Sequence, residues 1–159
     1  GKKPLIGLSV TKDVQDSILA MPAYASLIDI IDIRYWHYQA DGTAYEPKGG
    51  LNLAPRQHAR LLKPKKTSFE QVYRAVKEYK EKFPGKVVMY SGDSYPEFGI
   101  AAFMAGGSMA QLPIDTDADV LKTAVTMKPV KSTASNEYIL SNGKKSVIYN
   151  TETKRFSIQ

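Results

Sequence analysis

The chain has 159 residues, a length that suits one domain, and 43% of them are apolar, which is enough for a core. No run approaches the roughly 20 apolar residues of a membrane-spanning helix, and the absence of cysteine excludes disulfides and thiolate chemistry. The formal net charge of +6 would suit nucleic acid. The aromatic residues do not interleave with the basic ones as a stacking surface requires, however, so a solvated basic surface is the preferred interpretation.

The first part of the chain predicts two strands separated by a helix. The β-rich run Leu5–Val10 predicts a strand, and Thr11 or Asp13 is expected to cap the helix that follows. The β-branched and aromatic run Leu27–Tyr38 predicts a second strand. The residues of Asp41–Lys66 are rich in glycine and proline and predict a long irregular segment, of a length that is usually functional or disordered.

A capping pattern predicts the start of the next helix. Thr67 and Ser68 each have a Glu or Gln three residues later, which is the arrangement of a capping box. Apolar side chains then recur at the spacing of one helix face, and Pro84 with Gly85 ends the helix. This apolar face consists of Phe69, Val72, Tyr73, Val76 and Tyr79.

Two further strand–helix pairs are expected after this helix. The β-rich run Val87–Tyr90 predicts a strand, and a capping box after it predicts a helix over Pro96–Ala105. The second pair is a short strand at Met109–Leu112 and a helix at Asp115–Lys128.

The end of the chain has a different pattern. The dipeptide Asn142-Gly143 lies between two β-rich runs, Glu137–Leu140 and Ser146–Tyr149, and predicts a β-hairpin. Phe156–Ile158 is expected to be a third strand.

Strands that alternate with helices imply a parallel sheet. A complete (β/α)8 barrel typically needs about 250 residues, which is more than this chain provides. The predicted fold is therefore α/β: a partial, TIM-barrel-like parallel sheet of about four βα units over residues 1–130, then a short antiparallel β-meander over residues 131–159. A half-barrel leaves its inner face and both edge strands unpartnered, so we expect it to pair with a second copy or an N-terminal half. An open sheet with helices on both faces is the alternative.

Most of the chain, in the order of its elements, resembles a known family. The run VVMYSGD, a helix, MAGGSMAQLP, an amphipathic helix and YILSNGKKSVIYN resemble the C-terminal half of clan-A-type (β/α)8 glycoside hydrolases, and more closely a poorly characterised group of glycan-degrading proteins from gut-type bacteria. The resemblance implies that Leu5–Val10, Ile28–Tyr38, Val87–Tyr90 and Met109–Leu112 are the fifth to eighth barrel strands. It also implies a periplasmic or extracellular location and a carboxylate nucleophile after the seventh strand. The matching position is Asp93, where the clan usually has Glu, and the acid/base partner belongs after the fourth strand.

Asp93 is the candidate catalytic residue. A retaining glycosidase needs two carboxyl groups about 5–5.5 Å apart, one to attack the sugar and one to protonate the leaving oxygen, and Asp93 would supply the first. The sequence Ser-Gly-Asp-Ser is also ordinary turn chemistry, so a turn residue is the competing interpretation. Glu97 is interpreted as a capping-box residue and Asp13 as a helix cap, so no second catalytic carboxylate is assigned.

The second strand carries candidate substrate-binding residues. Alternate residues of a strand share one face, so Asp32, Arg34 and Trp36 are expected to point into a barrel. Ile31 and Ile33 are expected to point outward, onto helices. Arg34 would pair with Asp32, and Trp36 would stack on a sugar ring; a core ion pair beside a packed tryptophan is the alternative.

His37 and Tyr38, at the end of this strand, complete the candidate substrate-binding set with Arg34 and Trp36. His37 would hydrogen-bond a sugar hydroxyl, although a lone histidine beside aromatic residues is more often packed. No second histidine lies at metal-ligand spacing, so neither a metal site nor a cofactor is expected.

The favoured function is that of a glycoside-hydrolase-like domain for plant or host polysaccharide, a fragment or truncated relative that is not catalytically competent alone. The alternative is a non-catalytic carbohydrate-binding or assembly module that uses Trp36, Tyr38 and Tyr45. A third possibility is an open-sheet domain whose basic loop, Arg60–Lys66, binds an anionic partner. Neither a membrane nor nucleic acid is an expected partner.

Overall fold

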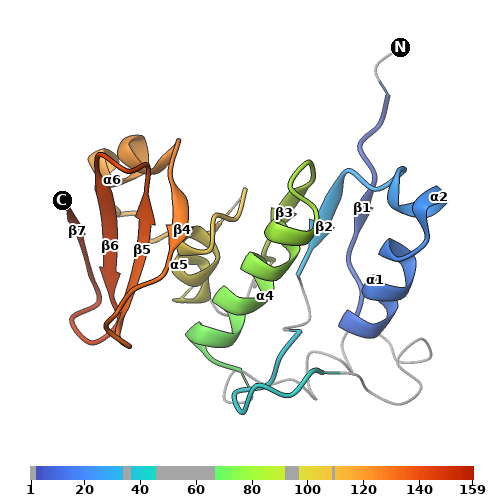
Figure 1. The fold of residues 1–159 in the computed structure, drawn as a ribbon, viewed down its shortest axis with the longest axis horizontal. Helices are drawn as coiled ribbons and strands as arrows, with labels where there is room; N and C mark the ends of the chain where they lie inside the picture. Colours follow the sequence, from blue (N-terminus) through green and yellow to red (C-terminus); the bar gives the residue numbers. More distant parts are fainter. Residues whose placement is uncertain (1–2, 34–36, 46–66, 92–96, 109) are drawn as a thin grey trace.

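The computed structural model describes residues 3–33, 37–45, 67–91, 97–108 and 110–159 (Figure 1). Within these ranges the protein is mixed α/β, with a three-stranded parallel sheet and a separate four-stranded antiparallel sheet after it. The expected parallel sheet with its helices and the expected antiparallel segment are both present. None of the helices in these ranges is long and apolar enough to cross a membrane.

The parallel sheet follows the order of the chain. Its strands are β1 (Gly7–Leu8), β2 (Ile30–Asp32) and β3 (Val87–Met89), and β2 lies between the other two. The register places Leu8 opposite Ile31, and Ile31 opposite Val88. Each strand therefore pairs with the strand that precedes it, and helix-containing connections join them.

The second strand is shorter than the expected run Leu27–Tyr38, because β2 ends at Asp32. Farther along, Tyr38 forms an isolated antiparallel bridge with Ala44. Gly42 lies in the turn between them with a φ of +85°, a backbone conformation that favours glycine. Tyr38 thus belongs to a local turn and not to the parallel sheet.

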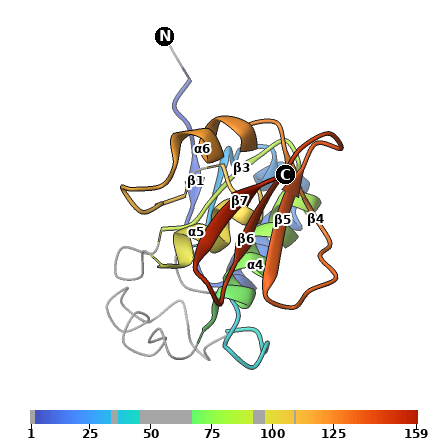
Figure 2. The same ribbon diagram turned by 90° about the vertical axis from the view of Figure 1, so that its left-hand side faces the viewer.

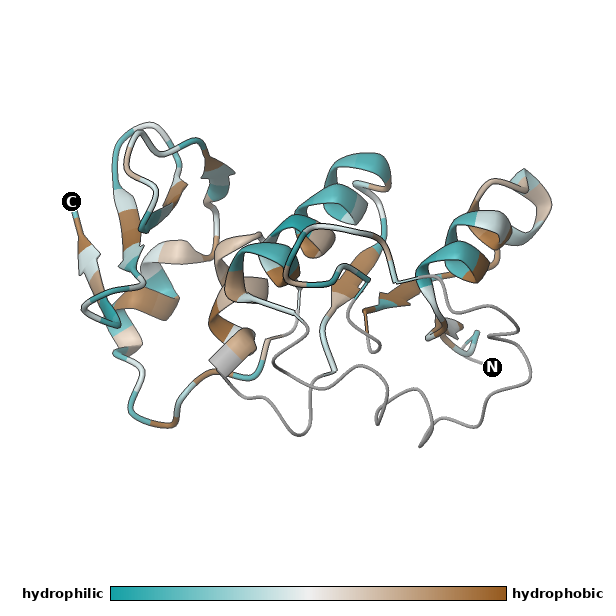
Figure 3. Ribbon diagram, turned by 90° about the horizontal axis from the view of Figure 1, so that it is seen from below, coloured by the Kyte–Doolittle hydropathy of each residue, from teal (hydrophilic) through white to brown (hydrophobic). Residues whose placement is uncertain are grey.

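Helices cover one face of the parallel sheet. The helices α1 (Lys12–Leu19) and α2 (Pro22–Ala25) join β1 to β2, and α4 (Phe69–Lys82) precedes β3. Figures 1 and 3 place α1 and α4 on the same side of the strands, and Figure 3 shows the hydrophilic face of α4 turned away from them. The capping prediction for α4 is confirmed, because Oγ of Ser68 accepts a hydrogen bond from the N–H of Gln71.

The main core lies between the sheet and these helices. Ile31, Ile33 and Val88 are 0% exposed and form one cluster with Val76 and Tyr79 of α4. The isoleucines therefore pack against the helices, as the alternation in the sequence predicts.

The opposite face of the parallel sheet is less covered. Ile30 and Asp32 of β2, and Val87 and Met89 of β3, are only partly buried. The parallel sheet thus has one fully buried face and one half-buried face.

The segment after β3 contains the expected helix but not the expected strand. The helix is α5 (Glu97–Met104). Residues 110–112 are not in a strand. The carbonyl oxygen of Gln111 lies so close to Gly99 of α5 that a Cβ on this glycine would be 1.5 Å from it. The described part of the predicted strand Met109–Leu112 therefore forms no strand, and its Gln111 lies against α5.

The antiparallel sheet contains the predicted hairpin and third strand. Gly143, in the hairpin turn, has a φ of +85°, as the Asn-Gly signal predicts. Figure 2 looks onto this sheet, whose strand order is that of the chain. The strands are β4 (Lys128–Val130), β5 (Glu137–Ser141), β6 (Ser146–Asn150) and β7 (Arg155–Ile158).

The strand β4 is not predicted by the sequence. The pattern predicts a helix over Asp115–Lys128, whereas α6 covers only Ala118–Ala124. Pro129 is tolerated in β4 because this strand lies at the edge of the sheet. The antiparallel sheet therefore begins shortly before residue 131.

Aromatic contacts join α4 to the antiparallel sheet. Phe69 stacks on Tyr149 of β6 with ring centroids 5.5 Å apart. Tyr138 of β5 lies 4.7 Å from both Phe69 and Tyr73, measured between ring centroids. The two sheets are thus joined through α4 and also through α5, whose Ala101 and Ala102 lie in the main core while its Ile100 and Met104 lie in the core of the antiparallel sheet.

We predict that Ile31→Ala lowers the free energy of unfolding by about 3 kcal/mol, because it empties a fully buried site between sheet and helices. Ile30→Ala, the matched change on the half-buried face, should cost clearly less. Chemical denaturation followed by circular dichroism measures both values. Equal losses would contradict the difference between the two faces.

Candidate functional site

The carboxyl ends of the parallel strands meet at one edge of the sheet. Ser9 follows β1 and Asp32 ends β2, and they are neighbours because Leu8 lies opposite Ile31. The hydroxyl of Ser9 donates a hydrogen bond to Oδ2 of Asp32 at 2.9 Å. Parallel α/β proteins place their active sites at this edge of the sheet, where polar side chains follow the strands. The expected partner of Asp32, Arg34, lies outside the described residues.

Unpartnered polar atoms occur in the residues at and after the carboxyl ends of these strands. Within the described residues, five buried side-chain N or O atoms have no hydrogen-bond partner. They come from the connection after β1, from the end of β2 and from the chain after β2. They are Asp13 Oδ1, Gln15 Oε1, Asp32 Oδ1, His37 Nδ1 and Tyr45 Oη.

Such atoms are costly. A buried polar group without a partner destabilises a fold by about 1–3 kcal/mol, and such a group in a native fold is explained by local strain, a catalytic role, or a bound water or ion. These five residues and Ser9 are therefore the candidate functional site, which we call the carboxyl-edge cluster.

His37 connects several members of the carboxyl-edge cluster. Its Nε2 lies 2.9 Å from Nε2 of Gln15, and its backbone carbonyl accepts a hydrogen bond from the N–H of Tyr45, also at 2.9 Å. The negative charge of Asp13 also favours the protonated form of the His37 ring. With the amide of Gln15 as donor, Nε2 of His37 accepts and Nδ1 carries the ring proton. The unpartnered atom of His37 is then a hydrogen-bond donor.

The ring of His37 is held neutral. The residue is 1% exposed, and its ring packs edge-on against Tyr79, 5.3 Å away between centroids. Burial lowers the pKa of His37, the positive charge of Lys12 lowers it further, and the pKa falls to about 3. His37 is thus packed, as the competing interpretation of the sequence holds, and it keeps one N–H without a partner among the described residues.

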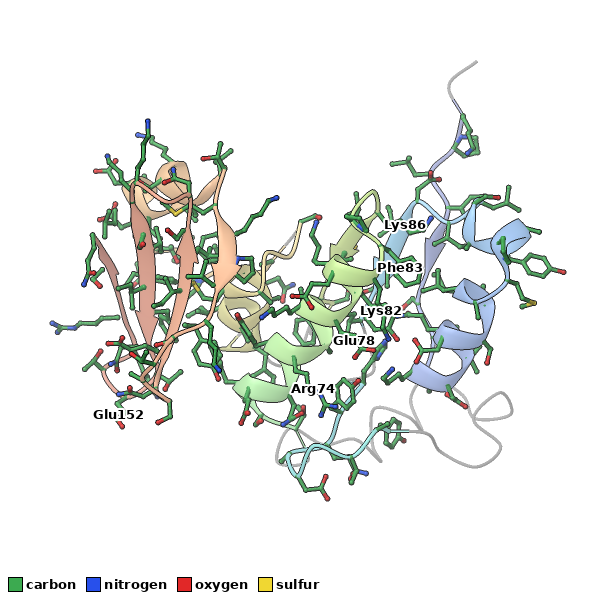
Figure 4. The ribbon with its side chains drawn as sticks, viewed as in Figure 1. Arg74, Glu78, Lys82, Phe83, Lys86 and Glu152 are labelled. Atoms are coloured by element: carbon green, nitrogen blue, oxygen red, sulfur yellow. The ribbon has the colours of Figure 1, made fainter. Side chains whose placement is uncertain are left out.

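A second polar network joins α1 to α4. Nζ of Lys12 contacts Oδ2 of Asp16 at 2.5 Å and Oε1 of Glu78 at 3.3 Å. The hydroxyl of Tyr38 donates to Oε2 of Glu78, and Lys82 contacts Oε1 at 2.6 Å. Figure 4 shows Glu78 and Lys82 on the side of α4 that faces α1. We call these residues the α1–α4 network.

The α1–α4 network keeps Glu78 ionised. Burial raises the pKa of Glu78, but hydrogen bonds from Lys82 and Tyr38 lower it more. The charge of Lys12 adds to this effect, and the resulting pKa is about 2. A general acid must hold a proton near neutral pH, so Glu78 is unsuited to that role.

Tyr38 is occupied by protein contacts. Only 5% of the residue is exposed, and the guanidinium carbon of Arg74 lies 3.9 Å from the centroid of its ring. Its hydroxyl binds Glu78. The structure therefore places this predicted substrate-binding residue in the α1–α4 network. The other predicted site residues, Arg34, Trp36 and Asp93, lie outside the described residues.

Several residues of the carboxyl-edge cluster could not be identified as site residues from the sequence. Ser9 directly follows a predicted strand, a position typical of active-site residues, but a single serine there is too common to indicate a site. Gln15 carries no signal, because a glutamine in a helix usually faces solvent. Across the described ranges, no group of three or more His, Asp or Glu side chains is arranged to hold a metal ion.

We predict that His37 makes stability depend on pH. The ordinary pKa of His is 6.5 and the folded value is about 3, so between these values the unfolded chain binds more protons. The free energy of unfolding should fall as pH drops through this window, by up to several kcal/mol at about 1.4 kcal/mol per pKa unit. His37→Gln should flatten this part of the profile. Chemical denaturation across the window tests it, and identical profiles would contradict the role of His37.

Comparison with known proteins places the chain in a family. The model of the domain of unknown function DUF6298 matches residues 1–127. The match contains the parallel sheet, the helices and every member of the carboxyl-edge cluster, and it ends before β4. No curated protein and no solved structure matches the chain. Because the match spans well over half of its length, the chain belongs to the DUF6298 family.

Proposed function

We propose that this domain is part of a glycoside-hydrolase-like (β/α)8 barrel that acts on a polysaccharide at the carboxyl edge of its parallel strands. The observation that carries the proposal is the set of buried, unpartnered polar atoms at and after the carboxyl ends of β1 and β2. Active sites of (β/α)8 enzymes lie at that edge. The carboxyl-edge cluster contains both hydrogen-bond donors and hydrogen-bond acceptors without partners. The hydroxyl groups of a sugar can satisfy both kinds.

The winding of the parallel sheet supports a barrel. Its strands follow chain order, and α1 and α4 lie on one face of it (Figure 3). A doubly wound open sheet has helices on both faces, whereas a barrel has helices on the outside only. The N–H of Ser108 also donates to the carbonyl of Val88 at 2.7 Å. The chain therefore reaches the free edge of β3 where a barrel's next strand would begin.

The half-buried face of the sheet supports the same proposal. Parallel sheets are normally covered on both faces, yet Ile30 and Val87 are only partly buried there. A barrel interior, completed by an N-terminal half or by a second copy, would cover them.

Asp93 would be the nucleophile. Its carboxylate would attack the anomeric carbon while a carboxylic acid protonates the departing oxygen, and water would then release the sugar from the resulting ester. Glu78 is not this acid, because its pKa is about 2. We assign the acid to no residue of this chain, so hydrolysis is expected only where the rest of the barrel is present.

A non-catalytic carbohydrate-binding module based on Trp36, Tyr38 and Tyr45 has less support. The ring of Tyr38 is covered by Arg74 and its hydroxyl is bound to Glu78. Neither is free to contact a sugar.

We predict that Asp93→Asn in the full protein lowers the release of reducing ends from plant or host polysaccharides by a factor of about 10³ or more, because it removes the nucleophile. Polysaccharide binding and Tm should stay as in the parent protein. The matched control Asp115→Asn changes an exposed carboxylate outside the site and should leave the rate unchanged.

Two results would overturn this function. One is an unchanged rate in Asp93→Asn. The other is a full protein that neither cleaves nor binds any of the plant and host polysaccharides tested. Binding without cleavage that disappears in Trp36→Ala would instead support the non-catalytic module.

A further inference from the structure

A groove of about 830 Å³ lies between α4 and the chain that leads from β4 into β5, and Tyr38, the residue after His37 of the carboxyl-edge cluster, also lines it. Its volume is within the roughly 300–1,000 Å³ range of small-molecule sites. One wall belongs to the parallel-sheet part of the protein and the other to the antiparallel sheet. Ligand sites occur preferentially at such junctions. We call it the α4–β5 groove; the residues that matter here are Glu70, Tyr73, Lys77, Lys131, Glu137 and Tyr138.

The α4–β5 groove has both polar and apolar surface, and its charged side chains balance. Four basic and four acidic side chains line it. A strongly charged ligand would therefore find no complementary surface. The lining favours a neutral ligand with many hydrogen-bonding groups.

Several polar groups in the groove are not used by the fold. Glu70, Lys131 and Glu137 form no ion pair or side-chain hydrogen bond with any described residue, and neither do the hydroxyls of Tyr73 and Tyr138. Glu70 and Lys131 are also exposed. The groove thus offers both free acceptors and free donors.

The two tyrosines give the groove a fixed wall. The ring of Tyr138 lies between those of Phe69 and Tyr73, 4.7 Å from each between centroids. Burial raises the pKa of Tyr138, Glu70 and Tyr73 raise it further, and it reaches about 12. The hydroxyl therefore stays protonated and can donate. A preorganised wall reduces the entropy that a ligand loses on binding.

We propose that the α4–β5 groove binds a neutral oligosaccharide. Sugar hydroxyls would donate to Glu70 and Glu137 and accept from Lys131 and from Tyr138, whose position the neighbouring rings fix. This inference deepens the proposed function, because it adds a glycan-binding site built from side chains other than those of the carboxyl-edge cluster. It does not depend on Asp93.

A peptide that adds a strand to the sheet edge is disfavoured as the occupant. β4 borders this region, and its Pro129 has no N–H to donate to an incoming strand. The groove is therefore suited to a ligand that binds side chains rather than backbone.

We expect cello-, xylo- or mannohexaose, added to the full protein at up to about 10 mM, to shift amide resonances of α4 and of residues 131–138 in two-dimensional NMR spectra. Trigalacturonate, the acidic probe, should bind more weakly. Glu70→Gln and Tyr138→Phe should each raise the dissociation constant about tenfold, the factor that corresponds to 1.4 kcal/mol. Both changes preserve the size of the side chain.

Matched controls lie outside the groove. Glu152→Gln changes a carboxylate at the turn between β6 and β7 (Figure 4), and Tyr24→Phe changes an exposed tyrosine of α2. Both should bind like the parent protein. Asp93→Asn should bind normally too, which separates this site from the proposed catalytic one.

The proposal is overturned if none of the three neutral hexasaccharides shifts these resonances. It is overturned equally if Glu70→Gln and Tyr138→Phe bind like Glu152→Gln, or if the shifts concentrate at Gln15, His37 and Tyr45. Tighter binding of trigalacturonate would also contradict a neutral ligand.

Discussion

The ammonium group of Lys12 is the charge on which the packing of α1 against α4 depends. The residue is only 7% exposed, and its ammonium lies between the carboxylates of Asp16 and Glu78 and near the rings of Tyr38 and Tyr79. A buried charge is tolerated only when it is paired. The two helices are therefore held at one spacing, and the carboxyl-edge cluster beside them is built on a fixed frame.

The parts of the fold that the sequence predicted well depend on neighbouring residues. Ser68 caps α4 through an N–H three residues away, and Asn142 and Gly143 set the hairpin by their own backbone preferences. The errors depend on distant contacts. Gln111 lies against α5 because Gly99 lets its carbonyl approach, and the strand β4 exists because β5 pairs with it. Neither contact leaves a local pattern.

The place of the candidate site was easier to predict than its members. A strand that ends just before a helix start points to the carboxyl edge of the sheet. Ser9 and Asp32 form a hydrogen bond at this edge, whereas Asp93, to which the pattern pointed, lies outside the described residues. The state of individual side chains follows from partners far along the chain. His37 is buried because Gln15 and Tyr79 enclose it, and Tyr38 is occupied because α4 supplies its partners. Spacing along a strand contains no information about such partners.

The ring contacts between α4 and the antiparallel sheet limit where the polypeptide can be truncated. Phe69 and Tyr73 lie inside the region that the family model covers, whereas Tyr138 and Tyr149 lie beyond it. A polypeptide that ends at the family boundary would expose the rings of Phe69 and Tyr73 to water, and exposed apolar patches of this kind promote aggregation. The stable folded unit of this protein is thus longer than the region that the family model matches.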